Sequence, residues 1–555
     1  MRFARFVFGV AIVMVAAWGA AAAHVTAPAV GGEPVWGGEL RFAIHSEPKS
    51  WDPLLAAEDA SGAIRLLTHG ALVGMNRRTQ KYEPQLAESW KILENGRKIV
   101  FQLRAGVTFS DGTPFTSRDV IATLKRAMNP SLHAPMGDSL IAAAGSGLVM
   151  EMPGVDRVSL TFPAPVANPL GLLESVPMLS SQSPLKDKAV LGPFEVAEYK
   201  AGAYVQLKRN PRYWRLGPGG RRLPYFDSVH LDIQTNRDIE LQRFRKGEFH
   251  LIEAIDSESM ARINAEMGSQ VAFDLGPAFE NEMLWFNMKP DAPIADYKKA
   301  WFQSRNFRRA IAESIHLDDI VRLVYQGRAT AAAGILSRAN QFWLKQGLES
   351  HPFDVGLAKK RLTQDGFQNR DGTLTDRGGH VVEFSLVTSS GGKTRTRIAA
   401  ILQDDLAKIG IKLNIVPLDF PSLLERIGRT ANYETALLGL VGEDIDPNGD
   451  SNVWLSHAAQ HMWNPNQKQP ATAWEAEIDK LIAAQAGSAD QKKRKAAFDR
   501  VQQIIWEEVP VIHLVNRNAV VAVSPRLRNV QAAVMNPHLF WNVDSMYLVP
   551  AEKKP

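Results

Sequence analysis

Apolar side chains recur at every second position between residues 98 and 103, where Ile99, Phe101 and Leu103 fall on one side of an extended chain. A period of two residues predicts a half-buried β-strand. The Asn95-Gly96 pair just before it favours a tight hairpin turn, because both residue types accept positive φ angles. The first clear prediction is therefore a hairpin whose second strand packs on a core.

A second turn and a helix follow this hairpin. Asp111-Gly112 predicts the turn. Thr116 and, three residues later, Asp119 form a capping-box pattern, which predicts a helix that begins near Ser117. The two aspartates are better explained as turn and cap residues than as catalytic acids or bases.

Patterning in the second half of the chain predicts an α/β unit. Residues 382–387 and 412–417 have the composition of strands, and 394–409 is predicted to be a helix between them. Strand, helix, strand order favours parallel pairing. A single amphipathic helix is expected over 308–325, and separate strands are expected at 511–515 and 520–523.

Several motifs resemble the bacterial extracellular solute-binding proteins of family 5, which serve peptide and nickel ABC importers. The motifs are Leu86-Ala87-Glu88-Ser89-Trp90, Ser110 to Thr116, Gly192-Pro193-Phe194, Asn210 to Trp214 and Arg308 to Ile311. The resemblance implies an α/β, two-lobed periplasmic binding protein fold of the large peptide-binding type (class II). It also implies three subdomains and a discontinuous first domain.

The expected domain boundaries follow from that resemblance. Domain I is expected to combine residues 37–74, 187–275 and 515–550, with domain II over 75–186 and domain III over 276–514. Residues 24–36 lack periodicity and are expected to form a flexible leader. Because the chain leaves and re-enters the first domain, a few connecting strands could act as a hinge.

The first 23 residues have the pattern of a secretory signal peptide. Arg2 and Arg5 precede an apolar run, and small residues lead up to Ala23, after which cleavage is expected. The chain has no cysteine, so no lipid anchor or disulfide framework is expected. These features predict a periplasmic protein that is not inserted in the membrane once the leader is removed.

Charge argues against a nucleic-acid partner. The full chain carries a formal charge of +5, and without Arg2 and Arg5 it has 62 basic and 59 acidic residues, or +3. This balance is nearly neutral for the length, and the basic runs at Arg221-Arg222 and Lys492 to Lys495 are interpreted as solvated faces.

The densest acidic cluster lies between Gly442 and Trp454. By the family resemblance, Glu443 occupies the place of the carboxylate that pairs with the α-ammonium group of a bound peptide. Peptide binders of the family commonly have Asp there, so Asp444 beside it is an alternative anchor. Asp446 precedes the proline of the motif and completes the predicted acidic site.

Two other interpretations of this cluster stay open. Asp444, Asp446, Asn448 and Gly449 fit the first half of a calcium loop, although Leu455 stands where that loop needs a glutamate. Alternatively, the carboxylates cap a helix through Val453.

Aromatic and imidazole side chains follow the acidic cluster. Trp454 and Trp463 are predicted to form apolar walls of a ligand pocket. His457 is a further ligand-binding candidate, and with His461, four residues later, it would share one face of a helix, a spacing compatible with two metal ligands. In the resembled family, the loop containing Glu47 faces the ligand, so Glu47 is also a candidate.

Catalytic motifs are missing from the sequence. It contains no nucleophile elbow, no P-loop and no dinucleotide fingerprint, so no enzyme activity and no cofactor are expected. We expect a monomeric solute-binding protein that captures a short peptide and works with ABC permease and ATPase subunits. The alternatives are a nickel chelate or another small solute, such as an opine or a sugar, and an exported hydrolase.

Overall fold

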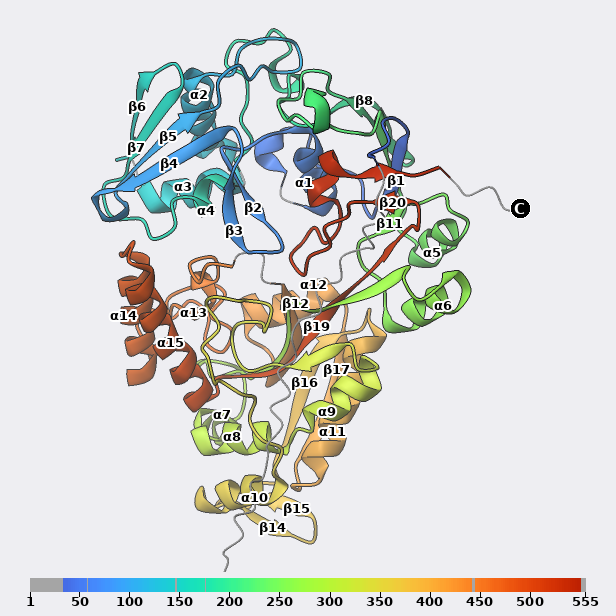
Figure 1. Ribbon diagram of the computed structural model, residues 1–555. Helices are drawn as coiled ribbons and strands as arrows, with labels where there is room; N and C mark the ends of the chain where they lie inside the picture. The colour runs from blue at the N-terminus through green and yellow to red at the C-terminus, as the bar shows by residue number, and fades with distance from the viewer. Residues whose placement is uncertain (1–32, 57, 145–146, 175, 442–444, 551–555) are drawn as a thin grey trace, which may run out of the picture.

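The computed structural model describes residues 33–56, 58–144, 147–174, 176–441 and 445–550. The chain forms two lobes, an upper and a lower one in the orientation of Figure 1. The upper lobe contains two four-stranded sheets, and the lower lobe is built on a larger mixed sheet. The expected two-lobed α/β architecture is therefore confirmed.

The first sheet of the upper lobe joins the start of the chain to its middle. Its order is β1 (Glu39–Ile44), β10 (Ser228–Ile233), β9 (Tyr204–Arg209) and β8 (Phe194–Lys200). β1 runs parallel to β10, and the other pairs are antiparallel. Its core also takes in apolar residues near the C-terminus, such as Val521 and Leu548.

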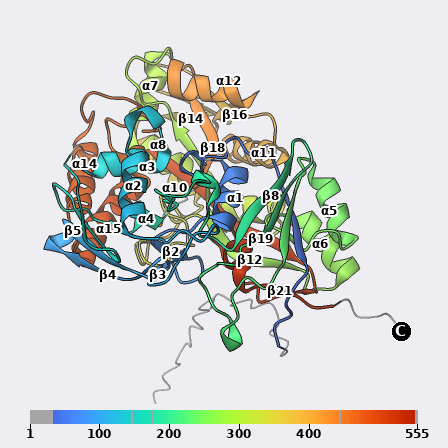
Figure 2. The same cartoon turned by 90° about the horizontal axis from the view of Figure 1, so that it is seen from above.

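The second upper sheet confirms the predicted hairpin. Its order is β4 (Ala87–Leu93), β5 (Lys98–Leu103), β7 (Arg157–Thr161) and β6 (Val149–Gly154). Ile99, Phe101 and Leu103 are buried, whereas the intervening residues of β5 are half-buried. Asn95 has a φ of 52° and Gly96 a φ of 88°, as the turn requires. Figure 2 shows the two upper sheets on opposite sides of α1 (Asp59–Thr68).

The helix after this hairpin also begins as predicted. α2 spans Ser117–Ala127, and both hydrogen bonds of the Thr116–Asp119 capping box are present. Asp119 is buried, and its other oxygen accepts the hydroxyl and the backbone N–H of Ser181, both at 2.8 Å. Both carboxylate oxygens therefore have structural partners.

The lower sheet has the order β11-β19-β12-β18-β16-β17, with β13 beside β19. Of these strands, β11 spans Leu251–Ile252, β18 spans Thr435–Val441 and β13 spans Ala329–Ala331. β16 (Glu383–Ser389) and β17 (Lys412–Leu418) are parallel and joined by α11 (Lys393–Ala407), which confirms the predicted α/β unit. β12 (Ala272–Phe286) and β19 (Val511–Val523) run antiparallel to each other and pass from the lower lobe into the upper one.

Two predicted elements differ from the structure. β19 is one continuous strand rather than two, because β12 pairs along its length through several register shifts. The helix expected over 308–325 is broken: α8 ends at Ser314 and Ile315 is extended. The next backbone N–H, of His316, donates to the carboxylate of Asp405 at 2.8 Å instead of continuing the helix.

The remaining elements complete both lobes. Those of the upper lobe and its connection to β12 and β19 are β2 (Val73–Asn76), β3 (Lys81–Pro84), α3 (Pro135–Ala144), α4 (Gly171–Glu174), α5 (Arg237–Arg245), β11 (Leu251–Ile252), α6 (Ser257–Met267), β20 (Leu527–Arg528) and β21 (Tyr547–Leu548). Those of the lower lobe are α7 (Asp296–Gln303), α8 (Arg305–Ser314), α9 (Leu317–Asp319), β13 (Ala329–Ala331), α10 (Val355–Gln364), β14 (Gln368–Arg370), β15 (Thr373–Thr375), α12 (Phe420–Leu424), β18 (Thr435–Val441), α13 (Ser451–Trp454), α14 (Ala473–Ala486) and α15 (Gln491–Glu508). Among the helices of the described ranges, none is both long and apolar enough to span a membrane.

Candidate functional site

The lobes meet at the turn between β2 and β3. The side-chain amide of Gln80 donates to the carbonyl of Ala339 at 2.7 Å and accepts the backbone N–H of Gln341 at 3.1 Å. The Gln341 side chain donates in return to the carbonyl of Arg78 at 3.4 Å. Three hydrogen bonds therefore connect one upper-lobe turn to one lower-lobe loop.

A second contact between the lobes is made by Arg494, on α15. Its guanidinium donates to the carbonyl of Ala167 in the upper lobe at 3.3 Å and pairs with Asp446 of the lower lobe at 2.6 Å. It also donates to the backbone carbonyl and the side-chain oxygen of Gln485, at 3.2 and 3.1 Å, and lies 4.7 Å from the ring centre of Trp343. The Arg494 side chain is only 4% exposed, and the carboxylate of Asp446 compensates its buried charge.

Both contacts lie next to the predicted acidic site. Asn340 donates to the carbonyl of Ile445 at 2.9 Å, and Arg494 holds the adjacent Asp446. Glu443 and Asp444, the predicted ligand anchors, lie outside the described residues. Asp446 is 5% exposed and serves as the counter-ion of Arg494, so the structure gives it a structural partner rather than an open face.

The calcium-loop interpretation does not fit the described part of the motif. Asp446 faces the guanidinium of Arg494, and the side-chain oxygen of Asn448 accepts a hydrogen bond from Gln485. The Oδ1 of Asp446 and the side-chain oxygen of Asn448 therefore already have protein partners. In the described ranges, no group of three or more His, Cys, Asp or Glu side chains is placed to hold a metal ion. The capping alternative is not supported by Asp450, which makes no side-chain cap to α13.

Trp463 lies in the core of the lower lobe. Its side chain is completely buried, and its indole N–H donates to Glu475 at 2.9 Å. The same carboxylate accepts hydrogen bonds from His461, Gln467 and Thr472. Burial alone would raise the pKa of Glu475, but these hydrogen bonds outweigh it and lower the pKa to about 2. In this conformation Trp463 supports the fold and presents no wall to a ligand, contrary to the prediction.

The predicted pairing of His457 with His461 is wrong. Helix α13 ends at Trp454, so the two histidines do not follow one another on a helical face. His457 is exposed, whereas His461 is fully buried between the carbonyl of Val453 at 3.1 Å and Glu475 at 3.3 Å. The spacing of four residues gave the expected pair only under the assumption of a helix.

Trp454 packs in the lower-lobe core beside β12 and β19. Its indole N–H is buried without an acceptor among the described residues. The Nε2 of His513 and the Oδ1 of Asn281 are likewise buried without a hydrogen-bond partner there. The Trp454 and His513 rings are 6.5 Å apart, and the amide of Asn281 lies 2.9 Å from the Nδ1 of His513. Burial lowers the pKa of His513 to about 3, so the ring is neutral. Buried polar atoms of this kind are commonly satisfied by water or by a ligand.

Glu47 lies on the loop after β1 and is held by the β8–β9 hairpin. Its carboxylate accepts the hydroxyl of Tyr199 at 2.7 Å and the backbone N–H of Gly202. Trp51 packs edge-on against Tyr199, with ring centres 4.9 Å apart. Both oxygens of Glu47 therefore have partners within the upper lobe in this conformation.

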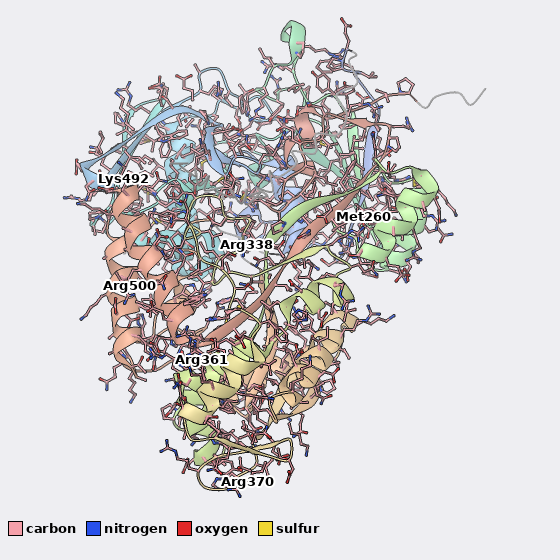
Figure 3. The ribbon with its side chains drawn as sticks, turned by 60° about the horizontal axis from the view of Figure 1, so that its bottom comes forward. Met260, Arg338, Arg361, Arg370, Lys492 and Arg500 are labelled. Atoms are coloured by element: carbon pink, nitrogen blue, oxygen red, sulfur yellow. The ribbon has the colours of Figure 1, made fainter. Side chains whose placement is uncertain are left out.

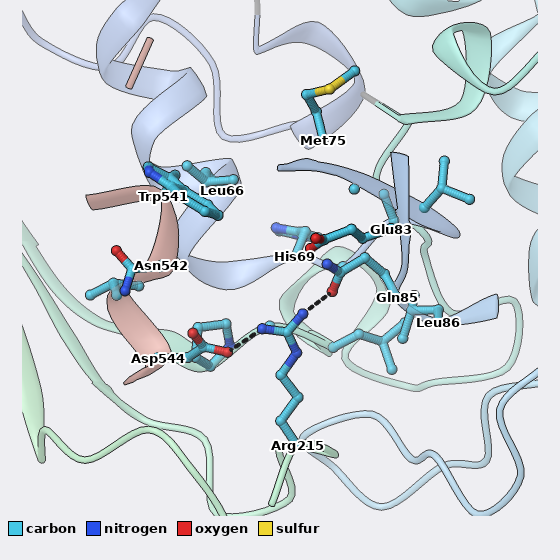
Figure 4. A pocket seen from close by; sticks show the side chains of 18 of the residues that line it. Leu66, His69, Met75, Glu83, Gln85, Leu86, Arg215, Trp541, Asn542 and Asp544 are labelled. Atoms are coloured by element: carbon cyan, nitrogen blue, oxygen red, sulfur yellow. Dashed lines mark hydrogen bonds and ion pairs between the residues drawn. The ribbon is translucent and has the colours of Figure 1, made fainter. Parts of the chain in front are cut away.

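A cavity of about 440 Å³ lies within the upper lobe, between α1, β2, β3 and the segment near Asp544 (Figure 4). Arg215 crosses it, pairing with Asp544 at 2.9 Å and with Gln85 at 2.8 Å. Burial lowers the pKa of His69 to about 4, so this lining side chain is neutral. β2 and β3 connect the cavity to the turn that carries Gln80. Sequence patterns did not reveal it, because its lining comes from residues between 65 and 545.

Sequence reasoning also missed the side chains that join the lobes. The prediction of a solvated basic face over Lys492 to Lys495 is wrong for Arg494, which is buried. Arg494, Phe498, Val501 and Ile505 are buried on one side of α15, at the i, i+4, i+7 and i+11 spacing of an inward face. That periodicity was the available signal. Gln80 and Asn340 carried no comparable signal in the sequence.

The fold and the lobe contacts define the class of the protein. Two α/β lobes connected by a pair of long antiparallel strands, and touching beside an acidic loop, form a two-lobed periplasmic-type binding protein. The model of the bacterial extracellular solute-binding proteins, family 5 (middle), matches residues 81–461. The chain therefore belongs to that family.

Known proteins show the same relationship over nearly the full chain. A probable ABC transporter-binding protein from Deinococcus radiodurans is 24% identical over 525 residues, which cover 87% of each chain. The ABC transporter substrate-binding protein CtaP from Listeria monocytogenes matches with a TM-score of 0.77 at 21% identity, over 93% of this chain and 100% of that one. The oligopeptide-binding protein AppA from Bacillus subtilis, solved with a nonapeptide, matches with a TM-score of 0.68 at 20% identity and the same coverage.

Proposed function

We propose that this protein is the exported solute-binding component of an ABC importer and that it captures a short peptide between its lobes. Family membership and the two-lobed fold support this function. AppA supplies a relative of the same fold that was solved with a peptide. The signal-peptide pattern of residues 1–23 supports export to the periplasm, where the chain would deliver its ligand to a membrane permease.

The observation that carries the proposal is the position of the acidic loop. Asn340 donates to the carbonyl of Ile445, and the residues on either side of Asn340 bond to Gln80 of the upper lobe. Arg494 pairs with Asp446 and donates to the carbonyl of Ala167 in the upper lobe. Glu443 and Asp444 directly precede these residues in the chain. The two candidate carboxylates are therefore attached to a segment that lies at the contact between the lobes, where a ligand enclosed by lobe closure would be.

In this proposal, Glu443 or Asp444 pairs with the α-ammonium group of the peptide, and Trp454 offers its indole N–H to a peptide oxygen. The interaction with the ammonium group is charge-assisted and favours ligands with a free N-terminus. Binding is the whole activity of the chain, which acts as a monomer. ATP hydrolysis belongs to the partner ATPase subunits.

Isothermal titration calorimetry with one tripeptide in free and N-acetylated forms tests this function. Acetylation, or the substitution Glu443→Gln together with Asp444→Asn, is expected to weaken binding by about 1.5 to 3 kcal/mol. Glu425→Gln is the control, because Glu425 is exposed on the same lobe and pairs with Arg429. Equal affinity for the two peptides would remove the ammonium contact from the proposal, and no binding of any peptide would contradict the function itself.

A further inference from the structure

We propose that Gln80 and Arg494 form a two-part latch that holds the lobes together and links their contact to the loop at Ile445 and Asp446. The inference rests on the proposed function, because it concerns how the ligand is retained. It assigns positioning roles to residues that lie outside the predicted ligand site. Each part of the latch connects the upper lobe to the loop.

The first part is centred on residues 339 to 341. On one side, Gln80 of the upper lobe bonds to the backbone of Ala339 and Gln341. On the other side, the Asn340 amide donates to the carbonyl of Ile445 at 2.9 Å, and its oxygen accepts the backbone N–H of Trp343 at 2.8 Å. Asn340 lies between Ala339 and Gln341, the two residues that bond to Gln80. A displacement of the upper lobe therefore shifts residues 339 to 341 and, with them, the hydrogen bond from Asn340 to Ile445.

The second part is centred on Arg494. Its guanidinium lies between the carbonyl of Ala167 in the upper lobe and the carboxylate of Asp446 in the loop. A planar guanidinium can hold several acceptors in fixed directions, which a lysine ammonium cannot do equally well. Removing one partner of such a buried pair leaves the other charge uncompensated. Arg494 therefore contacts the opposite lobe and the loop with the same charged group.

Close packing supports the contact around Arg494. Gly96, in the β4–β5 turn, approaches the loop between α14 and α15 so closely that a Cβ there would lie 2.9 Å from Ala489 and 2.7 Å from the carbonyl of Val166. The β4–β5 hairpin lies over the upper end of α15 in Figures 1 and 2. Figure 3 shows Lys492 at that end of α15 and Arg500 further along the helix.

The two parts act on adjoining residues, Ile445 and Asp446. Opening the lobes breaks the hydrogen bonds to Gln80 and Ala167. Conversely, a shift of the loop at Ile445 and Asp446 moves Asn340 and Arg494 away from the positions in which the lobes are in contact. The lobe contact and the loop position therefore stabilise each other, which is the thermodynamic form of coupling between two sites. The latch is expected to act chiefly on ligand release, because its contacts exist only when the lobes touch.

The distance between the lobes can be measured with two spin labels, since the chain has no cysteine of its own. Arg118→Cys on α2 and Lys360→Cys on α10 place the labels at exposed positions of the upper and lower lobe. Pulsed dipolar spectroscopy is performed without ligand in the labelled parent, in Gln80→Asn and in Arg494→Gln. Asparagine suits the positive φ of 55° at Gln80 but shortens the side chain, so the fold of each lobe is retained.

Gln80→Asn and Arg494→Gln are expected to increase the long-distance population and to speed release of a bound tripeptide by about three- to tenfold. Arg500→Gln is the matched control on α15, because Arg500 is exposed and pairs with Glu477 within the lower lobe. Distances in Gln80→Asn identical to those of the parent and of the control would overturn the latch. If the protein binds no peptide, the proposed function is contradicted. The latch is still tested in that case, because the distances between the spin labels are measured without ligand.

Discussion

Trp463 donates its indole N–H to the carboxylate of Glu475 at 2.9 Å, and this bond places the tryptophan in the core of the lower lobe. Its position after the acidic loop predicts that Trp463 lines a ligand pocket, and the spacing of four residues predicts that His461 shares a helical face with His457. Their common partner, Glu475, is instead the N3 residue of the α14 capping box. The segment between α13 and α14 is therefore organised around one buried carboxylate.

Glu475→Gln is expected to lower the free energy of unfolding by about 2 to 3 kcal/mol, because an amide nitrogen replaces an oxygen that accepts hydrogen bonds. Peptide affinity should change by less than twofold. Chemical denaturation and calorimetry provide the two measurements. Glu477→Gln on the same helix is the control, since its side chain is 45% exposed. Lost affinity with unchanged stability would give Glu475 a direct role in binding.

Acid should also reveal Glu475. Its folded-state pKa of about 2 lies below the ordinary value of 4.5, so its stabilising effect is complete above about pH 4.5 and is lost as the pH falls towards 2. At pH 3 the wild type should have lost about 2 kcal/mol through this group. Denaturant titrations at pH 5 and pH 3 should show a smaller decrease in Glu475→Gln, and an equal decrease would contradict the assignment.

Local elements were predictable where one short stretch determined its own structure. The Asn95-Gly96 turn, the alternation in β5 and the capping box at Thr116 depend on neighbours within a few residues, and each is found as predicted. The break after Ser314 was not predictable, because its cause, the carboxylate of Asp405, lies about 90 residues away. A local pattern of apolar and polar residues cannot reveal a partner that is so distant in the sequence.

The candidate site was less predictable for the same reason. The resemblance located the acidic loop, and the structure places its Asp446 beside Arg494 of α15. Charged residues of a run such as Lys492 to Lys495 are solvated only on the side of the helix that faces solvent. Arg494 lies on the buried side of α15. His457 and His461 have the spacing of one helical face, but they do not lie in a helix, so the spacing does not bring them together.

His513 predicts a second dependence on pH. Burial lowers its pKa to about 3 from the ordinary 6.5, so the neutral ring stabilises the fold above about pH 6.5 and this contribution is lost as the pH falls. Between pH 7 and pH 5 the loss should be about 2 kcal/mol. Thermal unfolding of His513→Gln should show a weaker decrease over this range. The exposed His457→Gln is the control and should match the wild type; a wild-type slope in both variants would exclude His513 as the cause.

The histidine pair predicts a negative result with nickel. Because His461 is buried against Glu475 while His457 is exposed, the two rings cannot hold one ion together in this conformation. Titration calorimetry with Ni²⁺ should give the same isotherm for the wild type and for His457→Ala. A stoichiometric Ni²⁺ site that disappears in His457→Ala would restore the nickel hypothesis.

Arg308, from the motif Arg308 to Ile311, is predicted to be a structural arginine. Its guanidinium donates to the carbonyls of Phe302 and Glu508, both at 2.7 Å, and of Val509 at 3.1 Å, and burial lowers its pKa to about 10. Arg308→Lys cannot reach all these acceptors and should cost about 2 to 4 kcal/mol of stability. Arg305→Lys, at a side chain that is 55% exposed, should cost far less in the same urea titration. Similar losses in the two variants would contradict the assignment.

The central claim is that this chain carries a peptide, and native mass spectrometry tests it most directly. The protein would be purified from the periplasm without denaturation, and the mass of any ligand that remains bound would be measured. We expect a series of masses spaced as short peptides, which would also give the length of the bound peptides. A single small organic mass or a metal-containing mass would contradict the peptide assignment, whereas the family and the fold would stand.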